Sequence, residues 1–513
     1  MKRNFYITAT ALFFLMSGCN EDFLEKKPSE RLSSEQIKEA AEKDPGLLNG
    51  NIAGLYSTMY NTGTGGTDLN HDDFGQKGYD IFSDMLSSDM TLGALNYGWY
   101  STVAGYTATR DYTTNPAYQP WRYYYRIIFA ANGVIDALGG TDEPQTEPLK
   151  KYIMGQAKAM RAYAYFYLAH FYATSYGDGT EKILPVYKDT KVPNQPLSTA
   201  EEVYSLIISD LTEAIAYLED FNRASKDQIN VWVAKGFLAY AYAARGAGND
   251  RQNVVNLTDD IIANSGFRPV NQDEVVAKFD AGTGALLNPE SGFNNVANPS
   301  WMWGVDLTIA NDLDLVSWWG QVDLYTYSYA WAGDPKQIDN DLYDAILDDD
   351  LRKQQFVDVD GNGTYWPINK FFAQHRTAEM DDSEWGGQRN IIADYVYMRV
   401  DEFYLLNAEA NAKMNNDAAA IDRLKELLQE RITDISYVDA LSGQALDDEI
   451  YLQTRIELWG EGKSYLALKR NKATVTRGPN HLFFAGDSFS YDADELTFPI
   501  PQAEVLNNPA LNE

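Results

Sequence analysis

Helical periodicity dominates the chain over residues 47–266. In the stretch 120–140, apolar residues recur at steps of three and four, namely Tyr124, Ile127, Ile128, Ala131, Ile135 and Leu138. This spacing places one apolar stripe along a helix, and such a stripe must be buried against a neighbouring element. A chain built this way is constrained to stack its helices face to face.

Three further stretches carry the same pattern. The first is residues 155–178, and the third is residues 230–248, which are rich in alanine. The second lies between them and opens on Ser198 and Glu201, which are at capping-box spacing. Successive amphipathic helices with short connections are typical of helical hairpins that bury their faces on one another. The sequence therefore predicts a mostly α fold with a scaffold like that of tetratricopeptide repeats, although the repeat consensus is poorly kept.

The composition and the periodicity of the sequence change at residues 267–394. Gly, Asn, Asp and Trp dominate there and the periodicity fades, which is typical of loops and turns. Because binding residues are often carried on loops held by a rigid scaffold, we expect this insertion to face a ligand. Helices are predicted again at 395–431 and 447–470. The expected organisation is a signal peptide (1–18), a tether and first helix (19–46), an N-terminal helical region (47–266), the loop-rich insertion (267–394), and a C-terminal helical region whose tail packs on the scaffold (395–513).

The only cysteine of the chain, Cys19, follows a short secretory signal. Two basic residues precede an apolar run at 5–16, and two small residues come directly before the cysteine. This arrangement resembles a bacterial lipobox, with Met16 where leucine is usual. It predicts cleavage before Cys19 and acylation of that residue, which would anchor the chain in outer-membrane lipid. An ordinary cleaved signal with an incidental cysteine is the alternative. The acidic residues just after Cys19 resemble the surface-export signal of Bacteroidetes lipoproteins, so we expect the protein to face the cell exterior.

Charge and motifs exclude several classes of function. The net charge is −32, and it becomes −34 without the signal, which carries two positive charges and no negative one. A nucleic-acid partner is therefore not expected, because phosphate backbones would be repelled. The chain lacks HExxH, GxSxG, P-loop and helix-opening GxGxxG motifs, and we predict that it is not an enzyme and requires no cofactor. His71, which precedes two aspartates, is interpreted as part of a polar loop.

Several stretches together resemble the SusD/RagB family of nutrient-uptake lipoproteins from Bacteroidetes outer membranes. They occur in the family's order: "YYYRIIFAANGVID", "AKAMRAYAYFYLAHFY", "PLSTAEEVYSLIISDL", "YMRVDEFYLLNAEANAKM", "RIELWGEGKSYLALKR" and "FPIPQAEVLNNPALNE". One departure is Ala467, where an aspartate is common. We interpret these motifs as structural, and expect Glu457 to form ion pairs with Arg455 and Arg470 that link helices. Glu457 and Glu461 lie four residues apart, which is the ordinary geometry of a paired helix face rather than of a catalytic pair.

The resemblance implies both a fold and a role. It implies a mostly α-helical protein that lies as a lid on a SusC-like TonB-dependent transporter at the outer face of the outer membrane. Family members bind glycans, or in some branches peptides, and pass them to the transporter. Glycan capture is thus the leading hypothesis, and oligopeptide capture and a lid that closes the transporter without contacting ligand are the alternatives.

Aromatic side chains are the candidates for glycan contact. The chain has 35 Tyr, 22 Phe and 11 Trp, and the electron-rich face of an aromatic ring attracts the weakly positive C–H face of a sugar. Two clusters stand out, "NYGWYST" and "SWWGQVDLYTYSYAWAGD". The candidate residues are Tyr97, Trp99, Trp318, Trp319, Tyr329 and Trp331. Core packing or contact with the transporter is the alternative for each ring.

A loop in the insertion raises the question of calcium. Asp358, Asp360, Asn362 and Gly363 match the first, third, fifth and sixth positions of an EF-hand loop. The twelfth position, normally a bidentate glutamate, is Asn369, and no helical pattern brackets the loop. Asp-Gly and Asn-Gly are also strong hairpin signals, so a surface turn is favoured over a calcium site.

Overall fold

The computed structural model describes residues 34–68, 70–374, 376, 385–387 and 389–512. Cys19 and the predicted signal peptide lie outside these residues, so acylation stays a prediction. The α-helices are α2 (Ser34–Lys43), α3 (Asn49–Thr58), α4 (Gln76–Leu86), α5 (Ser101–Ala104), α6 (Thr107–Arg110), α7 (Asn115–Ala137), α8 (Pro148–Tyr172), α9 (Ala200–Tyr217), α10 (Val231–Arg245), α11 (Asp250–Asn264), α12 (Trp319–Val322), α13 (Asn340–Ala345), α14 (Asp401–Ala412), α15 (Asp417–Leu428), α16 (Gln444–Glu457), α17 (Ser464–Asn471) and α18 (Gln502–Asn507).

The remaining elements are short. The strands are β1 (Met90–Leu92), β2 (Lys182–Pro185), β3 (Leu197–Thr199), β4 (Trp301–Val305), β5 (Lys336–Ile338), β6 (Tyr395–Arg399), β7 (Thr474–Thr476) and β8 (Ser488–Ser490). They form two-stranded antiparallel pairs: β1 with β5, β2 with β3, β4 with β6, and β7 with β8. The 3-10 turns are η2 (Pro45–Leu48), η3 (Pro289–Gly292), η4 (Ile309–Asn311), η5 (Leu351–Gln355), η6 (Ser436–Ala440), η7 (Asp494–Leu496) and η8 (Pro509–Asn512).

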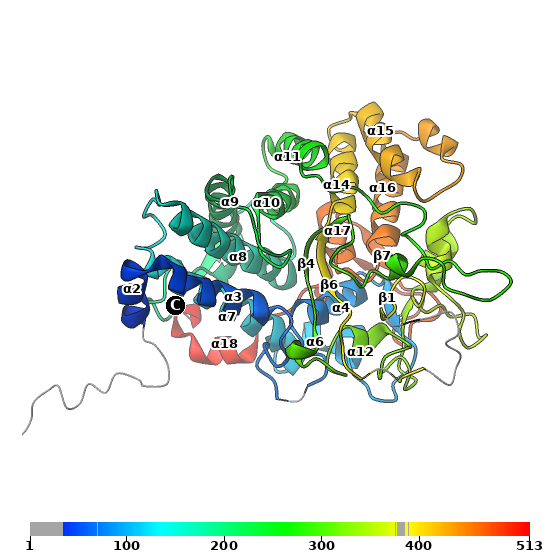
Figure 1. Ribbon diagram of the computed structural model, residues 1–513, viewed down its shortest axis with the longest axis horizontal. Helices are drawn as coiled ribbons and strands as arrows, with labels where there is room; N and C mark the ends of the chain where they lie inside the picture. The colour runs from blue at the N-terminus through cyan, green and yellow to red at the C-terminus, as the bar shows by residue number, and fades with distance from the viewer. Residues whose placement is uncertain (1–33, 69, 375, 377–384, 388, 513) are drawn as a thin grey trace, which may run out of the picture.

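A stack of helices forms the scaffold. Figure 1 shows α7, α8, α9, α10 and α11 following one another, with α14, α15 and α16 continuing the stack at the other side, and consecutive members of this series are packed together. The apolar stripes of α7 to α11 contribute to one core of buried side chains, and α14, α15 and α16 enclose a second, smaller one. The prediction of a mostly α fold with helical hairpins is confirmed, because period-3.6 patterning is a local property that survives tertiary packing.

Helix ends differ from the predicted ones for identifiable reasons. Helix α7 begins at Asn115, because the Thr114 side chain accepts a hydrogen bond from the backbone N–H of Ala117 and caps the first turn. Pro120 lies inside the helix. The Tyr172 hydroxyl from α8 donates to the Ala117 carbonyl at 2.7 Å and accepts from the Trp121 N–H at 2.8 Å, so it bridges two backbone groups beside the proline.

The capping box of α9 is shifted by one residue from the predicted pair. Thr199 and Glu202 form it, whereas Ser198 lies in β3 and Glu201 is inside the first turn. The Glu202 carboxylate accepts from the Thr199 backbone N–H at 2.8 Å, and the Thr199 hydroxyl accepts from that of Glu202. The predicted capping-box spacing is confirmed, but the pair chosen from the sequence, Ser198 and Glu201, was wrong.

Two stretches predicted as continuous helix are interrupted. Residues 395–399 are the strand β6, which pairs with β4 from the insertion and has all five residues buried. Residues 447–470 contain two helices, α16 and α17, separated by a turn in which Gly460 and Gly462 have φ of 79° and 70°. These values lie in the left-handed region that glycine adopts without strain, so the turn that ends α16 is encoded by the glycines.

A buried network of ion pairs ties the insertion to the C-terminal helices. Four basic and four acidic side chains take part, each at most 3% exposed: Arg352, Lys370, Arg399, Arg431, Asp350, Asp401, Glu457 and Glu461. The ion pairs predicted for Glu457 were assigned to the wrong partners, because Arg455 pairs with Asp89 and Arg470 pairs with Glu409. We call the eight residues the buried ion network.

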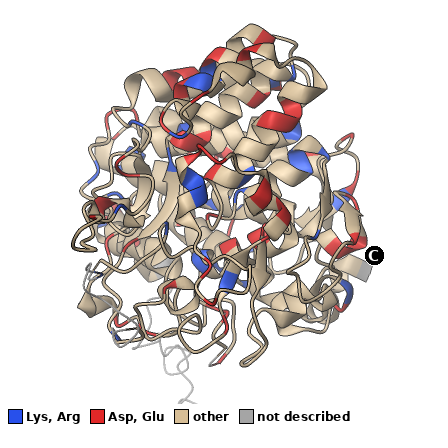
Figure 2. Cartoon of the chain, turned by 90° about the vertical axis from the view of Figure 1, so that its right-hand side faces the viewer, with Lys and Arg blue, Asp and Glu red and all other residues tan. Residues whose placement is uncertain are grey.

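No helix among the described residues is both long enough and apolar enough to cross a membrane. Figure 2 shows acidic residues spread along the helices and loops, with basic residues between them.

Candidate functional site

Two loops far apart in sequence meet and bring aromatic rings together. One loop follows β1 and carries Tyr97 and Trp99, and the other follows α12 and carries Tyr329 and Trp331. Tyr97 packs edge-on against Tyr329 with ring centroids 5.0 Å apart, and Trp99 packs against the same tyrosine at 6.4 Å. The structure thus places four of the six predicted aromatic residues in two adjoining loops. We define the aromatic platform as His71, Tyr97, Trp99, Tyr327, Tyr329 and Trp331.

Asp334 holds the two loops in this arrangement. Its carboxylate accepts hydrogen bonds from the backbone N–H groups of Asn96 at 2.7 Å, Tyr97 at 2.7 Å and Gly98 at 3.3 Å. The Asn96 side chain completes the connection by donating to the Gly333 carbonyl at 2.8 Å. Hydrogen bonds to an ionised acceptor are stronger than neutral ones, and Asp334 is buried, which makes it a rigid anchor for the first loop.

His71 is part of the platform although the sequence suggested only a polar loop. Its ring stacks on Trp99 with centroids 5.0 Å apart and planes 6° from parallel, and its Nδ1 lies 2.5 Å from the Tyr329 hydroxyl. Burial lowers the pKa of His71, so the ring is neutral at physiological pH and serves as a flat support for Trp99. Nothing in the local sequence indicates this role, because the contacts come from residues distant along the chain.

The platform residues differ in how much of the ring meets solvent. Tyr97 is 56% exposed and Trp331 is 43% exposed, whereas Trp99 is half-buried. Tyr329 is only 5% exposed, and burial raises the pKa of its hydroxyl. Tyr97 and Trp331 are therefore the rings most open to a ligand, and the buried Tyr329 packs against Tyr97.

Trp331 has a local environment of its own. Its ring lies 5.5 Å from that of Tyr327, and the guanidinium of Arg389 lies 4.1 Å above the Tyr327 ring. A Cβ at Gly386 would come within 2.3 Å of the Trp331 indole, so only glycine allows this backbone to approach the ring. Arg389 is exposed and provides hydrogen-bond donors beside the platform, a feature that the sequence analysis did not identify.

Trp318 and Trp319 lie in the core. Each is 1% exposed. Trp318 packs edge-on against Phe371 at 5.1 Å and lies under the Lys77 ammonium, and the Trp319 indole N–H donates to the Ala393 carbonyl at 2.7 Å. Neither ring has a free face, so the expectation that they contact ligand is corrected to a structural role.

Comparison with known families identifies the chain. A family model described as starch-binding associating with outer membrane matches residues 22–245, and the model of the SusD family matches residues 328–513. Together the two matches cover most of the sequence. The chain belongs to the SusD/RagB family.

Relatives share this family over long stretches. A SusD-like protein of Bacteroides ovatus is 22% identical over 458 residues, which span 77% of this chain and 80% of the relative. A SusD-like protein P25 of Formosa agariphila is 27% identical over 233 residues, 44% of this chain and 41% of that protein.

Solved structures have the same architecture. The SusD-like carbohydrate binding protein from Bacteroides vulgatus is 25% identical, with a TM-score of 0.71 over 91% of this chain and 97% of that chain. Surface glycan-binding protein A from Bacteroides uniformis is 17% identical, with a TM-score of 0.62 over 91% of this chain and 98% of that chain, and at this identity the likeness shows the fold alone.

The loop suggested as a calcium site in this SusD-family chain closes on itself. The two carboxylate oxygens of Asp358 accept from the backbone N–H groups of Asn362 at 3.1 Å and Gly363 at 3.0 Å, and Val357 bridges to Trp366 in antiparallel fashion. This geometry is that of a surface turn, the interpretation that the sequence favoured. The part of the chain that the structure describes contains no group of three or more His, Cys, Asp or Glu that could hold a metal ion. Calcium binding by Asp358, Asp360 and Asn362 stays a prediction, and the function proposed below does not require it.

Proposed function

We propose that the protein binds glycans at the aromatic platform and delivers them to a TonB-dependent transporter of the SusC type, as a binding protein and not as an enzyme. The observation that carries this proposal is that two exposed rings, Tyr97 and Trp331, lie on two loops that Asp334 and the Tyr97–Tyr329 contact join. Flat aromatic faces attract sugar C–H groups, and nearby polar groups can then select hydroxyls.

Family membership supports the same proposal. One of the matching family models is described as starch-binding and as associating with the outer membrane, and the Bacteroides vulgatus structure is described as carbohydrate binding. An anchor at Cys19 would keep the protein at the outer membrane beside its transporter. Two separate acyl chains hold a protein firmly, whereas one chain gives only marginal binding.

Glycan titrations of platform variants test the proposal. We expect a soluble form of the protein beginning at Asn20 to bind one class among a panel of neutral polysaccharides, measured by calorimetry. Tyr97→Ala and Trp331→Ala should each weaken this binding about 10-fold, because truncating a central aromatic contact typically costs 1 kcal/mol or more, which is about a 5- to 10-fold change.

The matched control is Tyr112→Ala, which removes a ring that is 41% exposed but lies outside the platform and should leave the affinity unchanged. Equal affinity of the platform variants and the unaltered protein would contradict the proposal. Binding of peptides alone would favour oligopeptide capture, and transport that survives all platform substitutions would favour a lid that does not contact ligand.

A second prediction concerns Asp334, which contacts the platform backbone rather than the ligand. Asp334→Asn leaves one acceptor oxygen for three N–H groups, so the loop at Asn96–Gly98 should lose its fixed position. We expect glycan affinity to fall at least about 10-fold, in line with hydrogen bonds to charged groups that are worth about 1.5–3 kcal/mol.

The control for Asp334→Asn is Asp280→Asn. Asp280 also accepts backbone N–H bonds, from Gly282 at 2.9 Å and Thr283 at 2.8 Å, but in an exposed turn of the same insertion. If both variants bind glycan like the unaltered protein, Asp334 does not position the platform.

A further inference from the structure

A groove lies on the half of the molecule away from the aromatic platform. It runs between α7, the loop at residues 187–193 and α18, and its volume is about 860 Å³. Figure 1 places α7 and α18 toward one end of the long axis, and β1 and α12, which flank the platform loops, toward the other. The groove wall on α7 consists chiefly of Tyr118, Trp121, Arg122, Tyr125, Arg126 and Phe129. We call it the α7–α18 groove.

Two arginines of this wall have no carboxylate partner among the described residues. Arg122 and Arg126 are exposed and lie one helical turn apart, and no ion pair joins either to an acidic group in the part of the chain that the structure describes. Arg122 donates to the Tyr118 hydroxyl at 3.2 Å. Because neither guanidinium group is paired with a carboxylate, both can attract an anionic ligand in a chain whose net charge is −32.

The acidic residues of the groove are already engaged elsewhere. Glu504 accepts from the Trp121 indole N–H at 3.3 Å and from the Asn508 side chain at 2.7 Å. Asp189 accepts from the backbone N–H groups of Lys191 at 2.7 Å and Val192 at 3.2 Å. The carboxylates thus hold the walls in place, and neither forms an ion pair with Arg122 or Arg126, whose side chains are exposed.

The same wall offers aromatic surface. Phe129 is 63% exposed, one turn beyond Arg126, and Tyr118 and Tyr125 are half-buried on the same helix. Leaving a phenylalanine in water forgoes about 1.5–3 kcal/mol of burial free energy. Exposed aromatic groups that line a concave surface together mark binding sites rather than the ordinary scatter of surface apolar residues.

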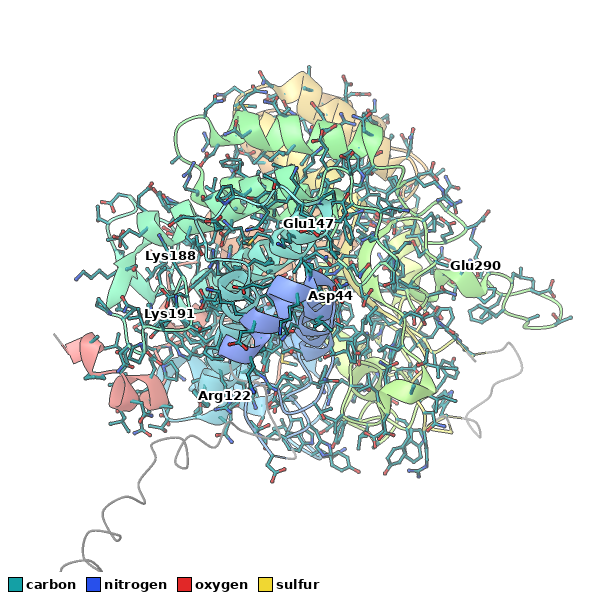
Figure 3. All side chains as sticks on the ribbon, turned by 60° about the vertical axis from the view of Figure 1, so that its left-hand side comes forward. Asp44, Arg122, Glu147, Lys188, Lys191 and Glu290 are labelled. Atoms are coloured by element: carbon teal, nitrogen blue, oxygen red, sulfur yellow. The ribbon has the colours of Figure 1, made fainter. Side chains whose placement is uncertain are left out.

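We propose that the α7–α18 groove is a second ligand site, which binds oligosaccharides that carry carboxylate groups, such as those built from uronic acids. A guanidinium fork matches a planar carboxylate with two parallel hydrogen bonds, and the aromatic faces accommodate sugar rings. The groove volume falls within the range of about 300–1,000 Å³ that is typical of small-molecule sites. The loop at 187–193 also carries exposed Lys188 and Lys191, which Figure 3 shows on the same face as Arg122.

This inference goes beyond the proposed function, since no platform residue belongs to the groove. The acidic character of the whole protein repels anionic sugars, so binding them requires a site with its own positive charge. Arg122 and Arg126 are the residues of the groove that would supply it.

The test compares a charged ligand with its neutral counterpart. The soluble form beginning at Asn20 is titrated with tetragalacturonic acid and, separately, with the methyl ester of the same tetrasaccharide. We expect the acid to bind more tightly than the ester, and its affinity to fall as the salt concentration rises. Arg122→Gln combined with Arg126→Gln should weaken binding of the acid at least about 10-fold, the equivalent of one lost charge-assisted contact of about 1.5 kcal/mol.

Two controls locate the site. Arg251→Gln removes an exposed helical arginine outside the groove, and Trp331→Ala alters the platform, and both should bind the acid like the unaltered protein. All substitutions lie at exposed positions, and thermal unfolding checks that the fold is kept.

Three results would overturn the inference. They are equal affinity for acid and ester, unchanged affinity of the double arginine variant, and loss of acid binding in Trp331→Ala. A tetraglutamate peptide that binds as tightly as the acid, and loses affinity in the same double variant, would show that the groove takes acidic peptides instead. Failure of neutral glycans to bind the platform leaves these outcomes unaffected, so the two proposals fail separately.

Discussion

Replacing Glu457 by glutamine is expected to lower the free energy of unfolding by about 3–5 kcal/mol at neutral pH. The Glu457 carboxylate accepts from Arg399 at 2.7 Å, Arg431 at 2.9 Å and Arg352 at 3.0 Å. Glutamine keeps the shape of the side chain but removes the charge that these three arginines share. Because all four side chains are at most 1% exposed, water cannot solvate the arginines in place of the lost carboxylate charge.

The balance of the buried ion network explains the size of this effect. It contains four positive and four negative side chains, so removing one carboxylate leaves an uncompensated positive charge in the interior. A complete buried network is not by itself evidence of high stability, since desolvation offsets much of the attraction. Breaking such a network by removing one partner is costly, because the desolvation penalty of the remaining charges is no longer offset.

The stability lost in Glu457→Gln should depend on pH in a defined direction. Burial would raise the pKa of Glu457, but Arg431, Arg399 and Arg352 outweigh it and hold the pKa well below its usual value of 4.5. A carboxylate whose pKa is lower in the folded state contributes stability above its unfolded pKa and loses it as the pH falls. The difference in unfolding free energy between the unaltered protein and Glu457→Gln should therefore stay constant between neutral pH and pH 4.5, and it should shrink below pH 4.5.

Urea unfolding at several pH values measures this difference. The control is Asp439→Asn, which breaks a 2.7 Å ion pair with Lys425 in which the aspartate is 60% exposed. We expect that variant to lose less than about 1 kcal/mol, as exposed pairs do. A loss below about 1 kcal/mol in Glu457→Gln as well would mean that the network contributes no more than a surface pair.

The helical scaffold was predictable because its signal is local. In α7 the apolar residues follow the helical period without reference to any other part of the chain. The strand β6 was missed for the opposite reason. All five of its residues are buried, so they show no alternation, and a short apolar run cannot be distinguished from helix by periodicity.

Long-range pairing accounts for most of what the sequence did not reveal. The three arginines that contact Glu457 lie 26, 58 and 105 residues from it, whereas the neighbours chosen as partners were close in sequence. The aromatic platform likewise depends on contacts between residues that are distant in sequence. Asp334 lies 238 residues from Asn96, and no pattern in either loop indicates that they meet.

Composition identified the aromatic clusters but not which rings face solvent. Trp318 and Trp331 lie in the same quoted stretch and have the same chemistry, yet one is 1% and the other 43% exposed. Burial is decided by the surrounding elements: Phe371 and Lys77 cover Trp318, and an open loop carries Trp331. The structure was therefore needed to divide the candidate residues into core and platform.

Substitution of these two tryptophans should separate stability from binding. Trp318→Ala is expected to lower the free energy of unfolding by about 3–5 kcal/mol, because it removes a large side chain from a packed core and leaves a cavity. The fraction of molecules that stay folded should bind glycan with unchanged affinity, since the ring does not reach the surface. Trp331→Ala should show the converse, with stability within about 0.5 kcal/mol of the unaltered protein and glycan affinity reduced about 10-fold.

Urea unfolding and glycan titration of the same preparations make the comparison direct. Trp318→Phe provides a milder variant that keeps an aromatic ring against Phe371 and stays folded if the alanine variant does not. If folded Trp318→Phe loses glycan affinity while Trp331→Ala keeps it, then the buried ring takes part in binding and the platform is misplaced. If instead stability and affinity separate as expected, the exposure of each ring, rather than its place in an aromatic-rich stretch, determines whether it can serve as a sugar contact.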